Sequence, residues 1–316
     1  MKHLRRKFRN YVPKLLSLVS KQVYYRMVRN RVNMPLQLGN DYCLKLAETE
    51  EEYQGAYHVL HDAYVDVGYA EQRQTGLRVT KYHALGTTYT MIVTHQKKVV
   101  GTCSLIVRGE FGIPMDSLLS STDNETQQPG AVEVSSLAVE KSNRNKGEIL
   151  FLLVKGVWLM CGEYLKQRTM YVVSNPETLP LYEGVLCFDK MNEKVISHYS
   201  FVNGAPAVLL RLNIEDVEPR YSAAYNHKAD MKNLFKFIMS SQRGGTDYDF
   251  VQLHPQANPP VISWEHYKRF FIELTDTHNN LTHQEKWYLM QHYGHYSDAK
   301  EYFDSTLNQV NEFKVA

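Results

Sequence analysis

The feature of the sequence that most constrains the fold is a β-rich segment that leads through a short polar turn into a long apolar helix. Residues 131–139 predict the strand, residues 140–147 the turn, and residues 148–166 the helix. Backbone N–H groups and the helix dipole converge on phosphate at such a turn, and a glycine lets the backbone approach closely. The turn therefore predicts an anion site made of Arg144, Asn145, Lys146 and Gly147. The alternative is an ordinary solvated turn, because Asn, Lys and Gly are common loop residues.

The segments around this unit also alternate between strand and helix patterns. Thr49 and Glu52 form a capping-box pattern, which predicts a helix that runs to about Val67. Further strands are predicted at residues 89–93, 99–107, 170–173 and 205–214. Such alternation predicts a layered α/β or α+β domain over residues 41–219.

The first 40 residues form a separate, basic arm. They hold ten Lys or Arg and no Asp or Glu, while the whole chain has a formal charge of +2, so the remainder sums to about −8. Leu15, Val19, Val23 and Met27 recur every four residues, which predicts an amphipathic helix that packs on the body or lies on a bilayer. The arm is expected to meet an anionic membrane surface or an acidic protein, or to be only solvated. Nucleic acid is disfavoured, because the basic charge is confined to one end and no reader motif is present.

Residues 220–316 predict a helical extension without a catalytic motif. Helices are expected at residues 229–240, 264–274, 283–292 and 297–313, with a proline-marked linker before the last three. The aromatic residues of these helices are either ordinary core or the lining of a tunnel.

Several classes of protein are disfavoured by composition. The four cysteines lie far apart without a CxxC pair, which argues against a zinc module or a disulfide framework and favours a reducing compartment. No histidine cluster has ligand spacing, so no metal is predicted. The longest apolar run, residues 149–161, is too short to span a bilayer, and no secretory signal is convincing. A cytoplasmic protein, with peripheral contact at the inner membrane surface as an option, is therefore expected.

Two motifs resemble the GNAT acyltransferase superfamily. Arg144-x-x-Gly147-x-Ile149 is similar to its R/Q-x-x-G-x-G/A loop, with Ile149 in place of a small residue. Asn175, Tyr182 and Phe188 are similar to the N-x(6)-Y-x(5)-F pattern of the next helix and strand.

A narrower resemblance is to the N-acyl amino acid synthases of the FeeM-like branch, and it covers about residues 42–214. The segments that carry it are Gly76–Leu85, Gly101–Ile106, Gly112–Asp116, Glu133–Val139 and Val202–Ala207. The resemblance implies an α+β GNAT fold with a mixed central sheet. It also implies transfer of a long fatty acyl group from acyl carrier protein or coenzyme A to the amino group of an amino acid. Related autoinducer synthases carry E-x-S-R on the same strand. Ser136 stands at the Arg position here, which weakens acyl-homoserine lactone synthesis as an alternative.

The same resemblance implies roles for individual residues. Glu133 is expected to act as the base on the amine, and Tyr182 to protonate the leaving thiolate. Their alternatives are a structural ion pair and a packing tyrosine. The backbone of Leu137, Ala138 and Val139, with the Arg144–Gly147 turn, is expected to hold the phosphopantetheine of the donor. Independently of the resemblance, Arg78 with Tyr82 and His83 follows the first predicted helix and is expected to bind the carboxylate of the acceptor, because a guanidinium suits a carboxylate. Ser135 and Asn175 are also expected to contact the acceptor.

Other readings of the same fold stay open. Cys103, within an apolar strand, is expected to be inert core and not an acylated nucleophile. The C-terminal extension is expected to cover the acyl site or to dock a partner. A short-chain acetyltransferase is a further enzymatic alternative, and from another class comes a non-catalytic sensor of acyl groups or of carrier protein.

Overall fold

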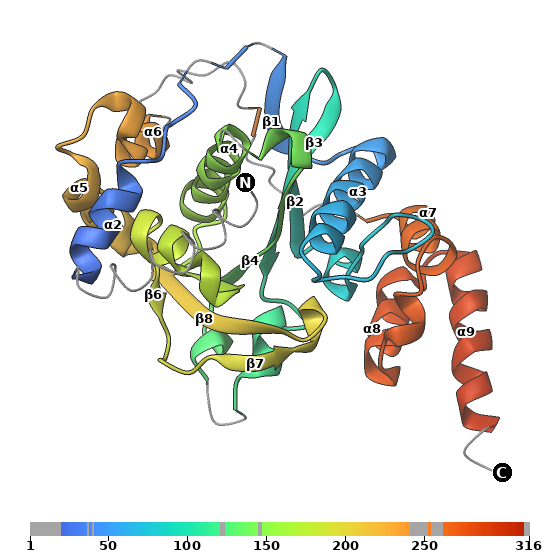
Figure 1. Cartoon of the computed structure of the whole chain (residues 1–316). Coiled ribbons are helices and arrows are strands. Elements are labelled where there is room, and N and C mark those ends of the chain that lie inside the picture. The colour runs from blue at the N-terminus through green and yellow to red at the C-terminus, as the bar shows by residue number, and fades with distance from the viewer. Residues whose placement is uncertain are drawn as a thin grey trace, which may run out of the picture.

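An open mixed sheet, of eight strands in the part of the chain that the structure describes, forms the centre of the protein (Figure 1). The computed structural model describes residues 20–36, 38–39, 41–120, 124–144, 147–240, 252–253 and 262–312, the last seven of these by backbone alone. The sheet order is β1-β2-β3-β4-β5-β8-β6, with β7 on β8. Among the described strands, only β4 and β5 pair in parallel. The strands are β1 (Tyr42–Leu46), β2 (Thr88–His95), β3 (Lys98–Val107), β4 (Ala131–Val139), β5 (Thr169–Ser174), β6 (Asp189–Lys190), β7 (Ile196–Tyr199) and β8 (Ala205–Asn213).

Two helices cover opposite faces of this sheet, α3 (Glu50–Asp66) and α4 (Glu148–Trp158). Neighbouring residues of β2 show the two faces: Met91 and Val93 join the core that contains α4, while Ile92 joins the core that contains α3. Because side chains alternate along a strand, a strand buried on both faces is apolar throughout its length. The layered α+β architecture expected from the sequence is confirmed.

The local signals of the sequence correspond to the observed elements. Thr49 accepts from the backbone N–H of Glu52, and the Glu52 carboxylate accepts in return from the backbone N–H of Thr49, so the capping box opens α3. The hairpin between β2 and β3 turns through Gln96 and Lys97, both of which have positive φ, as the tightest hairpin turns require. The predicted helix over residues 148–166 is α4 followed by one π-helical turn, Leu159–Tyr164.

Three shorter helices lie beside α4 on its side of the sheet: α2 (Lys21–Arg29), α5 (Val217–Tyr225) and α6 (Leu234–Met239) (Figure 1). The sequence did not predict α5, whose first turn contains Pro219 and whose apolar residues follow no clear stripe. Tyr221 and Tyr225 nevertheless bury their rings there and donate to the backbone carbonyls of Leu186 and Val185. The amphipathic arm is described only from residue 20 onward, so Leu15 and Val19 lie outside the described residues.

The remaining helices form a layer on the far side of α3. They are α7 (Trp264–Tyr267), a π-helical turn (Lys268–Glu273), α8 (His283–Tyr293) and α9 (Ser297–Glu312). Trp264, Tyr267, Phe270 and Phe271 are buried in one aromatic core with Tyr57 of α3. These rings are therefore core, and within the described residues they line none of the cavities of the site. No helix in the described ranges is both long and apolar enough to cross a bilayer.

Candidate active site

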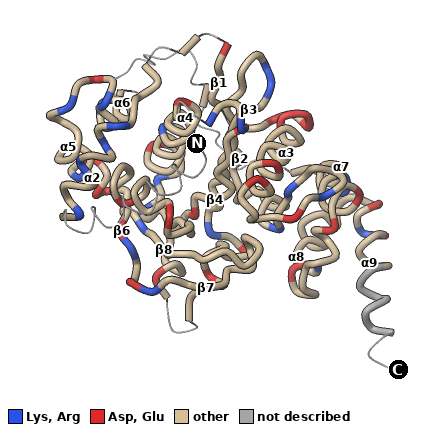
Figure 2. Tube along the Cα trace, viewed as in Figure 1, with Lys and Arg blue, Asp and Glu red and all other residues tan. Residues whose placement is uncertain are grey.

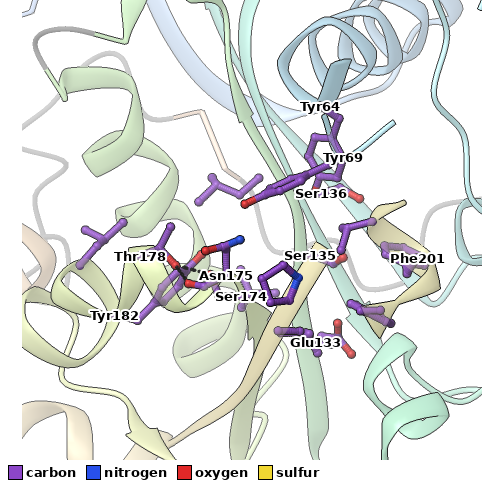
Figure 3. A pocket seen from close by; sticks show the side chains of 18 residues that line it. Tyr64, Tyr69, Glu133, Ser135, Ser136, Ser174, Asn175, Thr178, Tyr182 and Phe201 are labelled. Carbon is purple, nitrogen blue, oxygen red and sulfur yellow. Dashed lines mark hydrogen bonds between the residues drawn. The ribbon is translucent and has the colours of Figure 1, made fainter. Parts of the chain in front are cut away.

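The site lies where β4 and β5 separate. The two strands pair only over Ala131–Glu133 and Thr169–Tyr171. Beyond that point β4 stays with β3 and β5 stays with β8, so the facing backbone edges of β4 and β5 have no partner strand in the described sheet. A cavity of about 210 Å³ occupies this gap (Figure 3). Ends of parallel strands that diverge are where α/β folds bind ligands.

A bulge in β4 sharpens the separation. Ser135 pairs with Ser104 and Ala138 with Thr102, which leaves Ser136 and Leu137 together opposite Cys103. Ser136 has a φ of 54°, the left-handed region that non-glycine residues rarely adopt. Such bulges bend a strand and redirect its side chains, often next to active sites. The bulge therefore turns the end of β4 away from β5.

Glu133 is the buried carboxyl of this cavity. Its side chain is 2% exposed, and it accepts a hydrogen bond of 2.7 Å from the backbone N–H of Met115. Burial raises the pKa of Glu133 to about 8; the Met115 N–H acts in the opposite direction, and nearby Asp116 adds to the rise. Within the described residues Glu133 forms no ion pair, unlike the structural alternative considered above. A carboxyl with this pKa can both accept and release a proton near neutral pH.

Tyr182 lines the same cavity from the other side (Figure 3). It lies in a π-helical turn, Pro180–Val185, that follows β5, and its ring packs edge-on against Phe188 with centroids 5.8 Å apart. Burial raises the pKa of the Tyr182 phenol above its ordinary value. The hydroxyl therefore stays protonated at neutral pH and is a hydrogen-bond donor.

A second cavity of about 340 Å³ adjoins the first and shares Tyr64, Tyr69 and Leu137 with it. It extends along Ala138 and Val139 to Arg144 and Gly147. Gly147 has a φ of 72° and caps the N-terminus of α4, where backbone N–H groups lack partners within the helix.

The cation of this second cavity already has an acidic partner. Arg144 donates to the carbonyl of Val139 at 2.8 Å and to the Asp66 carboxylate at 3.1 Å, so a bound phosphate would share the guanidinium with Asp66. Asn145 and Lys146, predicted for the same role, lie outside the described residues.

A third cavity is apolar and smaller, about 40 Å³. It shares Val134, Leu137 and Tyr182 with the first cavity. Its remaining walls come from β3, β5, α4, the segment after Tyr182, α5 and α6. The lining side chains of these elements are Cys103, Leu153, Val154, Val157, Trp158, Met170, Val172, Leu186, Phe188, Val217, Tyr221 and Ile238. Burial raises the pKa of the Cys103 thiol to about 12, in keeping with an inert core cysteine.

The predicted acceptor residues divide into two groups. Ser135 and Asn175 line the first cavity (Figure 3). Arg78 lies next to it: its guanidinium is 4.8 Å from the ring centroid of Tyr64 and 5.4 Å from that of Phe201, and both rings line the cavity. It also donates to the carbonyl of Phe201 at 2.6 Å.

Tyr82 and His83 are not brought to the cavity, because the short helix that carries them (Lys81–Ala84) turns both side chains into the core. His83 contacts Thr80 and, through Nε2, the hydroxyl of Ser104, and burial lowers its pKa to about 4. Tyr64, Tyr69 and Phe201 were missed from the sequence. The sequence carries little sign of them: Tyr64 and Tyr69 lie near the end of the first predicted helix, and Phe201 lies just before the last predicted strand.

Together, a gap between parallel strands with a buried carboxyl and a phenol, a helix N-terminus at one end and an apolar cavity at the other supply the groups that acyl transfer from a thioester to an amine requires. The family model described as "N-acyl amino acid synthase FeeM" matches residues 55–213, half of the chain. The chain belongs to this family.

Solved structures with a similar fold include three groups of enzymes. FeeM, an N-acyl amino acid synthase from uncultured soil microbes, is 20% identical, with 56% of this chain and 93% of that chain covered and a TM-score of 0.47. The CoA-dependent acyl-homoserine lactone synthase BjaI is 13% identical, with 68% and 94% covered and a TM-score of 0.48. A spermidine N-acetyltransferase SpeG mutant from Vibrio cholerae is 14% identical, with 58% and 99% covered and a TM-score of 0.39. A comparison with curated proteins gives no match.

Proposed function

We propose that this acyltransferase moves a long fatty acyl group from the phosphopantetheine of acyl carrier protein, or from coenzyme A, to the α-amino group of an amino acid. The observation that carries the proposal is that Leu137 borders all three cavities. The three cavities therefore form one path. The cavity at Gly147 would take the phosphate and polar arm of the donor, the cavity at Glu133 and Tyr182 its thioester, and the apolar cavity its acyl chain. The apolar cavity is small as it stands, so a long chain has to displace side chains of its α5–α6 wall.

In the proposed reaction Glu133, in its ionised form, takes a proton from the ammonium group of the acceptor, directly or through water. The freed nitrogen lone pair attacks the thioester carbon, and the C–S bond breaks as the amide C–N bond forms. Backbone N–H groups on the unpaired edge of β4, near Leu137–Val139, are suited to bind the carbonyl oxygen as its negative charge develops. Tyr182 donates to the departing thiolate, and the second ammonium proton leaves to solvent.

Arg78 is proposed to bind the carboxylate of the acceptor, because a guanidinium matches a carboxylate with two parallel hydrogen bonds. It faces no acidic side chain within the described residues, and burial lowers its pKa from the ordinary arginine value. An incoming carboxylate would therefore supply the missing counter-charge. Ser135 and Asn175, on β4 and directly after β5, are proposed to orient the rest of the acceptor.

The proposed setting is the cytoplasm, with peripheral contact to the inner membrane surface through residues 1–32. All four cysteines are free, which suits a reducing compartment. An N-acylated amino acid with a long chain would itself be a membrane lipid.

The test is a reconstituted reaction that contains the purified protein, long-chain acyl carrier protein or acyl-CoA, and a mixture of amino acids. Thiol release and mass spectrometry of N-acyl products are followed for wild type, Glu133→Gln and Glu193→Gln, a change at a carboxylate outside the three cavities. Product from the wild type and Glu193→Gln, with little from Glu133→Gln, is expected. Equal product from all three would remove Glu133 from the mechanism. Donor binding without product from any variant would move the assignment to a non-catalytic acyl-binding protein.

A further inference from the structure

Helix α2 keeps bulky apolar side chains in water. None of its nine residues is buried. Val23 and Met27, one turn apart, are 49% and 45% exposed, and Met231, in the turn after α5, is 49% exposed. The described part of the row that the sequence predicted either to pack on the body or to lie on a bilayer is therefore left uncovered. Exposed apolar residues that gather beside one another mark an interaction surface more often than scattered ones do.

The orientation of α2 is fixed by its opposite side. Lys21 and Tyr25 both bind the Glu183 carboxylate, at 2.6 and 2.7 Å, and Arg29 donates to the carbonyl of Gly184 at 2.7 Å. The Tyr25 ring lies so close to Gly184 that a Cβ there would be 2.8 Å from it. Because these contacts hold one side of the helix against the body, Val23 and Met27 stay on the other side.

Cations surround the exposed apolar residues. Arg26 lies one helical turn from Val23, beside the row that Val23 and Met27 form, and Lys228 and Lys232 flank Met231 in the sequence. Lys228 also bonds Asn30, and the backbone N–H of Met34 donates to the carbonyl of Met231 at 2.8 Å, so the two segments lie side by side. Figure 2 shows Lys and Arg on α2 and in the adjoining stretch between α5 and α6.

The charge of this region is not neutralised within the described residues. Arg26 and Lys232 form no ion pair there, and Asp230 is engaged by Lys236. The pKa of Lys228 is lowered, first by burial and then by Arg29, Arg26 and Lys232. The 20 residues that precede α2 in the sequence add six more cations and no acid.

We infer that Val23, Arg26, Met27, Met231 and Lys232, here called the α2 face, bind a bilayer surface that contains anionic phospholipid. A helix with apolar side chains flanked by Lys and Arg lies in the headgroup region, where the apolar groups enter and the cations meet phosphate. An acidic carrier protein would satisfy the cations, but the exposed valine and methionines favour the bilayer. The inference deepens the peripheral membrane contact proposed above, by naming the surface and the lipid, and it does not depend on the acyl-transfer reaction.

The test is co-sedimentation of the full chain with vesicles of phosphatidylcholine alone and of phosphatidylcholine with phosphatidylglycerol. Binding to the anionic vesicles only, weakened when salt rises from about 0.1 M to about 1 M, is expected because the Debye length falls from about 10 to about 3 Å. Val23→Asp with Met27→Asp, and separately Arg26→Glu, should lower the partition coefficient about tenfold. Val195→Asp is the matched control, because Val195 is 51% exposed next to β7 and should leave binding unchanged.

Far-ultraviolet circular dichroism and thermal melting would establish that the variants fold. Variants that fold and still bind anionic vesicles as the wild type does would overturn the inference, and the first 19 residues would then carry any binding. It would also be overturned if the wild type ignored vesicles while the α2-face changes weakened binding to purified acyl carrier protein.

Discussion

The raised pKa of Glu133 makes a quantitative prediction about pH. If ionised Glu133 is the base, kcat/KM should rise with pH and level off above the pKa of about 8. Only about a tenth of the molecules carry the carboxylate at a pH one unit below that pKa, and about nine tenths one unit above it, so the rise is close to tenfold. The perturbation is Asp116→Asn. It removes a negative charge that raises the pKa of Glu133 and leaves the Arg108 cation without its carboxylate partner. The profile should therefore move to lower pH.

The same pKa has a consequence for stability, and its sign can be worked out. The ordinary value for this carboxyl is 4.5 and the folded value is about 8, so between them the folded state holds the proton and the unfolded state does not. Stability therefore falls as pH rises through this window, by an amount of the order of 5 kcal/mol at full ionisation. Glu133→Gln, which cannot ionise, should remove this loss.

The assay pairs steady-state kinetics with denaturant unfolding at about pH 6 and about pH 9. The amine of the acceptor also titrates in this range, so the unfolding data, which contain no acceptor, isolate Glu133. The stability of Glu133→Gln relative to the wild type is expected to be larger at about pH 9 than at about pH 6, by about 2–3 kcal/mol, because the lower pH already lies inside the window between 4.5 and about 8. An equal stability difference at both pH values, together with an Asp116→Asn profile that does not move, would refute the reasoning.

Three further predictions concern the other walls of the site. Tyr182→Phe should lower kcat by about 10²-fold with the KM of the donor nearly unchanged, as measured by thiol release, because the ring is kept and only the proton donor is lost. Arg78→Gln should raise the KM for the amino acid by about 10- to 100-fold and leave thioester binding intact, since a charged hydrogen bond contributes about 1.5–3 kcal/mol; an unchanged KM would remove Arg78 from the acceptor site. Ile238→Ala should favour longer acyl donors in a chain-length series, and should cost about 2–5 kcal/mol of stability because Ile238 is 1% exposed.

Much of the architecture could be predicted from the sequence because its signals are local. The capping box at Thr49, the β2–β3 hairpin and the strand–turn–helix around Gly147 each depend on residues close together in the chain. The same locality explains why Glu133, Ser135 and Leu137 could be assigned to one site: they lie within five residues of one predicted strand. The structure places Tyr182 and Asn175 at the same cavity because β5 pairs beside β4.

The parts that sequence reasoning missed depend on distant contacts. The β4 bulge needs the register with β3, which no local pattern reports. Tyr82 and His83 were assigned to the acceptor by position along the chain, but the burial of their short helix depends on β3 and the C-terminal layer. The α5 wall of the apolar cavity depends on the hydroxyls of Tyr221 and Tyr225. They donate to backbone carbonyls 35 and 40 residues away in the sequence.

The aromatic core shared by α3 and the C-terminal helices also constrains how this chain can vary. Tyr57 on one side and Trp264, Tyr267 and Phe270 on the other are buried in the same core. A recombination event that exchanged one side alone would leave large rings in water, where they promote self-association. The acyltransferase fold and its last helices are therefore expected to be inherited as one unit, with compensating changes on both sides of this contact.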